Sequence, residues 1–69
     1  MLNHPLIQFA THHPETAHNI RRLLIDARNG QELQGYDYLY TITGVHTASV
    51  RDYSAPQYLS LLNAINGLN

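Results

Sequence analysis

The chain has 69 residues, 43% of them hydrophobic, and no cysteine, which permits one small domain over residues 1–69 and excludes a two-domain enzyme, a disulfide framework and a thiolate zinc site. Four arginines, no lysine and five acids give a formal net charge of -1, so the cationic excess that favours nucleic-acid binding is missing. Because such a chain buries only about 60% of its unfolded surface, its core is marginal alone and we expect a homodimer.

Two helices are predicted in the first part of the chain. Asn3 suits an N-cap and Pro5 fits the first turn, where its missing N–H is harmless, so a short helix is expected over Asn3–His12. The residue before a proline is disfavoured in a helix, so a second, amphipathic helix should begin at Pro14 and end at Asn29-Gly30. Its apolar residues follow the spacing of one buried stripe: Ala17, Ile20, Leu23, Leu24 and Ala27.

A two-stranded antiparallel hairpin is predicted after a loop that ends at Gly35. From Tyr36 the hydrophobic period changes to two in β-favouring residue types, and a second such run covers Val45 to Asp52. A three-residue turn, Ile42-Thr43-Gly44, would place Gly44 in the left-handed region. In this register one face carries an aromatic row and its cross-strand neighbours: Tyr36, Tyr38, Tyr40, His46, Ala48 and Val50. Which face the helices cover is left open.

The last helix has the clearest start signal. Ser54 as N-cap with Gln57 three residues later forms a capping box, and Tyr53 and Tyr58 flank it as a hydrophobic staple. Gly67 marks its end. The apolar stripe of this C-terminal amphipathic helix is Tyr58, Leu61, Leu62 and Ile65. The predicted fold class is therefore α+β, in the order short helix, amphipathic helix, hairpin, amphipathic helix.

The sequence contains no pattern typical of an enzyme or a metal site. His12, His13 and His18 lie within seven residues, but neighbouring histidines point in different directions and the His-Glu-x-x-His pattern is absent. No serine lies in a glycine-flanked strand-to-helix turn, and the carboxylates form no acid/base pair. We therefore expect a chain that is not an enzyme and takes no cofactor or metal.

The predicted function is protein binding, by a small inhibitor or adaptor of the kind that mobile elements also encode, which would occlude or tether another protein. Arginine and tyrosine are common anchors of protein interfaces, and six residues are predicted to contact the partner: Arg21, Arg22, Arg28, Tyr36, Leu39 and Tyr53. The alternative is a small DNA-binding transcriptional regulator that uses the three arginines. Because the longest apolar run is Leu23 to Ile25, we expect no membrane span and a cytoplasmic location.

Overall fold

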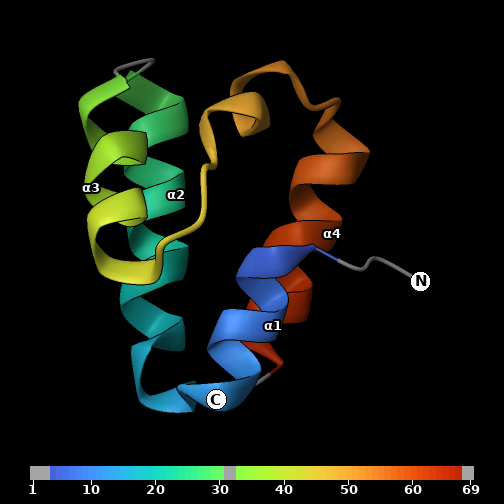
Figure 1. Ribbon diagram of the computed structural model, residues 1–69. Coiled ribbons are helices and arrows are strands. Elements are labelled where there is room, and N and C mark those ends of the chain that lie inside the picture. Colours follow the sequence, from blue (N-terminus) through green and yellow to red (C-terminus); the bar gives the residue numbers. More distant parts are fainter. Residues whose placement is uncertain (1–3, 31–32, 68–69) are drawn as a thin grey trace.

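The protein is helical throughout the part of the chain that a computed structural model describes, residues 4–30 and 33–67 (Figure 1). Two short 3-10 helices and four α-helices follow one another in the order α1 (Pro5–His12), η1 (Pro14–Thr16), α2 (Ala17–Gly30), α3 (Leu33–Thr43), η2 (Ala48–Asp52) and α4 (Ala55–Asn66). The α+β prediction is therefore wrong, and the fold is a small all-helical bundle.

Helix α1 begins on a histidine cap. The imidazole Nδ1 of His4 accepts a hydrogen bond from the Leu6 N–H at 3.0 Å, and Pro5 occupies the first helical position, where no N–H is needed. The predicted helix is confirmed, with His4 in the capping role that was assigned to Asn3, a residue outside the described part of the chain. Leu6 and Ala10 face the core.

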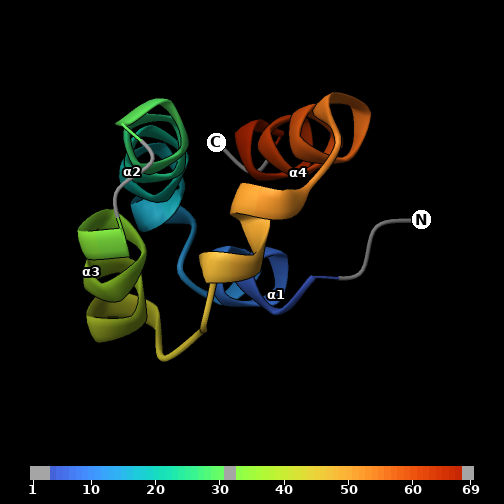
Figure 2. The same ribbon diagram turned by 90° about the horizontal axis from the view of Figure 1, so that it is seen from above.

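Helix α2 is the central element of the bundle, since it packs against both α3 and α4 (Figures 1 and 2). The predicted second helix is confirmed from Ala17 to Gly30, and its first turn, from Pro14, is a 3-10 helix. Four residues of the expected stripe are buried and Leu23 is half-buried. The buried four are Ala17, Ile20, Leu24 and Ala27.

The predicted hairpin is absent, because its first half forms α3 and much of its second half forms η2. In α3 the buried residues are Tyr36 and Leu39, which are three residues apart as on one face of a helix. The prediction of a loop up to Gly35 is also wrong at its end, since α3 already begins at Leu33, and residues 31 and 32 lie outside the described part of the chain. Gly44 ends this region at a positive φ of 73°, as predicted, although it follows a helix instead of forming a strand turn.

Close contact with α2 explains why this segment is helical. A Cβ atom built on Gly35 would lie 2.7 Å from the Cβ of Ala27, so the two helices approach where both side chains are minimal. Burying Tyr36 and Leu39 against a neighbouring helix stabilises the bundle by more than the small differences in intrinsic propensity that favour a strand. An isolated two-stranded ribbon has no such support.

Helix α4 matches its prediction closely. The Ser54 hydroxyl accepts from the Gln57 N–H at 3.4 Å, and the Gln57 side chain accepts from the Ser54 N–H at 3.2 Å, which completes the capping box. The buried residues Leu61, Leu62 and Ile65 face α1 and α2, and Tyr53 and Tyr58 are both half-buried against the same core.

Candidate protein-interaction surface

Arg28 is part of the fold and not of a free cationic surface. Its Nη1 donates to the Val50 carbonyl at 2.8 Å and its Nη2 to the Tyr53 carbonyl at 3.0 Å. The guanidinium also lies 4.3 Å from the centroid of the Tyr58 ring. Arg28 thus ties the end of α2 to η2 and to the start of α4, and its donors are turned towards the protein.

The other two predicted arginines differ from each other in exposure. Arg21 is half-buried, and its Nε atom is buried without a hydrogen-bond partner among the described residues. Arg22 is exposed on the outer side of α2. The three arginines that the sequence placed in one binding patch therefore occupy three different environments, and only Arg22 of the three is exposed.

Two of the predicted contact residues lie in the core. Tyr36 is 2% exposed and Leu39 is 0% exposed, because both lie on the inward face of α3. The prediction that they lie on the surface depended on the strand alternation and is wrong. Tyr53 is half-buried, with its ring edge-on to that of His4 at 6.4 Å between centroids, so it offers a partner only part of its surface.

Burial also changes the ionisation of the inner tyrosines. Burial raises the pKa of Tyr36 above the usual tyrosine value, and the positive charge of Arg28 acts in the opposite direction. The pKa of Tyr58 is raised for the same reason and is likewise opposed by Arg28. Both hydroxyls therefore stay protonated at neutral pH. They are neutral groups of the core, consistent with a structural role.

The exposed apolar surface is concentrated on α3, which the strand interpretation did not reveal. Of five exposed large hydrophobic residues in the described part of the chain, four belong to this helix and one, Leu59, to α4. The exposed fractions on α3 are 50% for Leu33, 55% for Tyr38, 45% for Tyr40 and 39% for Ile42. A helical period applied to residues 33–43 would have placed these side chains opposite or beside the buried pair.

The exposed residues form two rows along α3. Tyr38 and Ile42, four residues apart, share one flank of the helix, whereas Leu33 and Tyr40, seven apart, share the other. Tyr40 is held in place by its stacking on the exposed His46, with 4.1 Å between ring centroids and 14° between planes. The polar residues between the rows are Gln34, Asp37 and Thr41.

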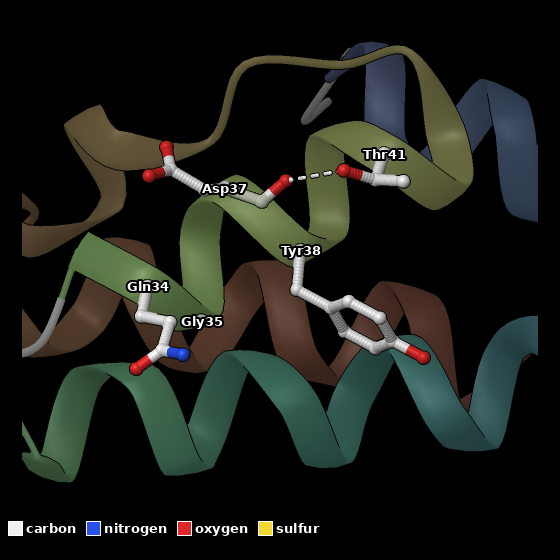
Figure 3. A pocket seen from close by; sticks show the side chains of 5 residues that line it. All are labelled: Gln34, Gly35, Asp37, Tyr38 and Thr41. Atoms are coloured by element: carbon white, nitrogen blue, oxygen red, sulfur yellow. Dashed lines mark hydrogen bonds between the residues drawn. The ribbon is translucent and has the colours of Figure 1, made fainter.

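An open depression of about 550 Å³ lies on this outer face (Figure 3). Its lining residues are Gln34, Gly35, Asp37, Tyr38 and Thr41. In Figure 3, Gln34 and Tyr38 project on the side of α2, and the Asp37 carboxylate projects on the opposite side. The Thr41 hydroxyl donates its hydrogen bond to the backbone carbonyl of Asp37 at 3.1 Å and not to the Asp37 carboxylate. We refer to the lining residues together with Ile42 as the α3 surface.

The histidines do not form a metal site in the described residues, where no group of three or more His, Cys, Asp or Glu could hold an ion. His12, His13 and His18 are all exposed around the junction of α1 and α2. The His13 Nδ1 lies 3.8 Å from the Glu15 carboxylate, and its ring packs on Phe9 at 4.6 Å. The three histidines are therefore exposed polar side chains at a helix junction.

Comparisons with protein-family models, with curated proteins and with solved structures found no match. Among the helices of residues 4–30 and 33–67, none has the length and apolar character that crossing a membrane requires.

Proposed function

We propose that this chain is a small, non-enzymatic protein-interaction module that binds another protein through the α3 surface and thereby occludes or tethers it. The observation that carries the proposal is the concentration of exposed large hydrophobic side chains on one 11-residue helix. Single exposed apolar residues are ordinary on a protein surface, but several on one short helix, with Tyr38 and Ile42 on the same flank, are more typical of an interaction site.

The composition of α3 supports the same proposal. Asp37 is the only charged residue between Leu33 and Thr43, and two of the exposed apolar residues are tyrosines. The centres of protein interfaces are depleted in charge and enriched in tyrosine, which provides a large contact area with little loss of side-chain entropy. A helix of this kind fits a groove on a partner, with residues one turn apart as its anchors.

The DNA-binding alternative has less support. It relies on Arg21, Arg22 and Arg28 acting together on phosphates, and the guanidinium of Arg28 is already engaged by two backbone carbonyls. One exposed arginine on α2 is too little positive charge for phosphate binding. We therefore propose a protein and not a nucleic acid as the partner.

The matched pair Tyr38→Ser and Leu59→Ser tests the proposal. Both remove an exposed apolar side chain of similar accessibility, 55% and 53%, from a different helix, so both variants should stay folded by circular dichroism. In a pull-down from the native host with the tagged chain, Tyr38→Ser should reduce partner recovery at least about tenfold, as expected for an interface tyrosine, and Leu59→Ser should not. Equal recovery with both variants would contradict the proposal.

The homodimer predicted from chain length is a separate proposal. Light scattering on the purified protein should give twice 7.8 kDa at micromolar concentration if it holds. A monomer with a concentration-independent melting temperature would contradict it.

A further inference from the structure

Arg21 carries a positive charge that no carboxylate of the described residues neutralises. Its side chain is half-buried, and its Nε atom is buried without a hydrogen-bond partner among those residues. The ion pair found there joins His13 and Glu15 and does not involve Arg21. A partly desolvated guanidinium without a counter-ion is unusual, because the burial of an unpaired charge costs free energy. The neighbours of Arg21 one turn away along α2 are not acidic either: Ala17, His18, Leu24 and Ile25.

Arg21 lies on the side of α2 that faces α4 (Figure 2). It precedes Arg28 by seven residues, or about two turns, so both side chains leave α2 on the same face. The Arg28 guanidinium lies 4.3 Å from the centroid of the Tyr58 ring, which places this face beside α4. Helix α4 itself contains no charged residue.

The electrostatic field at this flank is positive. Burial raises the pKa of the Tyr58 hydroxyl, whereas the positive charges of Arg28 and Arg21 act in the opposite direction, and no carboxylate of the described residues contributes. Asp26, the acid of α2, lies about 140° around the helix from Arg21 and one turn from Arg22. The donors of Arg28 are directed to two backbone carbonyls. Arg21 is therefore the arginine of α2 with neither a nearby acid nor a protein acceptor.

We infer that the flank of α2 beside α4 is a carboxylate-binding site, in which Arg21 holds the carboxylate and the Tyr58 hydroxyl is a second donor. The two oxygens of a carboxylate match the planar guanidinium, which can donate two parallel hydrogen bonds to them. Because the Nε atom is withdrawn from water, the attraction between Arg21 and an anion is screened less than at a fully exposed arginine.

This site goes beyond the proposed function, because it is separate from the α3 surface. Ala27, the residue of α2 that meets Gly35 of α3, lies about 120° around the helix from Arg21. A free small acid and an acidic side chain of a protein present the same group to Arg21, so the chemistry of the site is common to both sources.

Two pairs of probes test the site on the whole chain by NMR at neutral pH and constant ionic strength. Acetate is compared with its neutral analogue acetamide, and acetyl-Ala-Glu-Ala-amide with the same peptide carrying glutamine, each added to about 50 mM so that a contact of millimolar affinity approaches saturation. The charged member of at least one pair should shift the Arg21 Nε–H signal and the amides of residues 17–25 and 57–62 saturably, and its neutral analogue should not.

Two variants locate the site. Arg21→Met should weaken carboxylate binding at least about tenfold, and Arg22→Met, the matched change of the exposed neighbouring arginine, should weaken it less than about twofold. Circular dichroism checks that both variants fold, and the comparison of each acid with its neutral analogue on the natural chain remains decisive if Arg21→Met does not.

The outcomes separate the two sources and the alternatives. Binding of acetate as well as the glutamate peptide would support a site for a free acid, and binding of the peptide alone would support an acidic segment of a protein. Equal shifts with charged and neutral probes, equal losses in the two variants, or tighter binding of inorganic phosphate than of either carboxylate would contradict the inference. None of these results bears on the α3 surface, which the comparison of Tyr38→Ser with Leu59→Ser tests independently.

Discussion

Helices α3 and α4 are similar in length but very different in how far their sequences reveal them. Helix α4 begins with a capping box whose two hydrogen bonds both form, so a signal within four residues locates its start. Helix α3 lies after a segment outside the described residues, and its alternating tyrosines suggest a strand. The difference teaches that a capping motif has one structural meaning, whereas an aromatic alternation is compatible with both a strand and a helix.

The largest expected effect separates these two interpretations of α3. Leu39→Ala should lower the free energy of unfolding by about 2–5 kcal/mol, because Leu39 is fully buried in the helix. Tyr38→Ala should cost less than about 1 kcal/mol, because its side chain is 55% exposed. Urea denaturation measures both values. In a hairpin buried on its tyrosine face, the order of the two effects would be reversed, so a larger loss for Tyr38→Ala contradicts the helix.

The contact of α3 with α2 gives the next largest effect. Gly35→Ala normally stabilises a helix interior by about 0.5–1 kcal/mol, but here the new Cβ would lie 2.7 Å from Ala27, so we expect a loss of about 1–3 kcal/mol. Combining it with Ala27→Gly should recover part of the loss, because that change vacates the space. A gain in melting temperature for Gly35→Ala alone would show that the helices do not cross closely there.

The stability of α4 is tested best at its N-cap, Ser54. Ser54→Ala removes the hydroxyl that accepts from the Gln57 N–H and should cost about 1 kcal/mol. Ser60→Ala, an exposed change in the interior of the same helix, should be neutral or slightly stabilising, since alanine has the higher helix propensity. Thermal denaturation of the two variants compares them directly, and equal effects would mean that the capping box contributes nothing to stability.

The smallest expected effect concerns the N-cap of α1. This cap is a histidine, which can gain a proton as the pH falls, whereas the cap of α4 is a serine, which cannot. Desolvation by burial lowers the pKa of His4, and its Nδ1 can accept from the Leu6 N–H only when it carries no proton. The folded state therefore favours neutral His4, so this contribution is present above the unfolded pKa of about 6.5 and is lost as the pH falls below it. The ring of Tyr53 faces the imidazole from the segment before α4.

The matched variant is His4→Asn, which can cap without titrating in this range. Between about pH 7.5 and pH 5.5 the melting temperature of the natural chain should fall more than that of His4→Asn. The four exposed histidines are common to both proteins, so the difference between them isolates His4. Parallel pH profiles would assign the acid sensitivity to those other groups.

By itself, the sequence determined the elements whose signals are local. The proline at the start of α1, the apolar stripe of α2, the left-handed Gly44 and the capping box of α4 each depend on residues within one or two turns, and all are present in the structure.

Only the tertiary structure decided the state of residues 33–52 and, with it, the candidate site. The helix α3 forms where Gly35 meets Ala27 and Tyr36 and Leu39 enter the core, contacts between residues distant in the chain that no local period encodes. The same packing turned Arg28 inward to the Val50 and Tyr53 carbonyls. Because a strand and a helix distribute the same side chains over different faces, the helical period places Tyr36 and Leu39 in the core and Tyr38 and Ile42 on the surface.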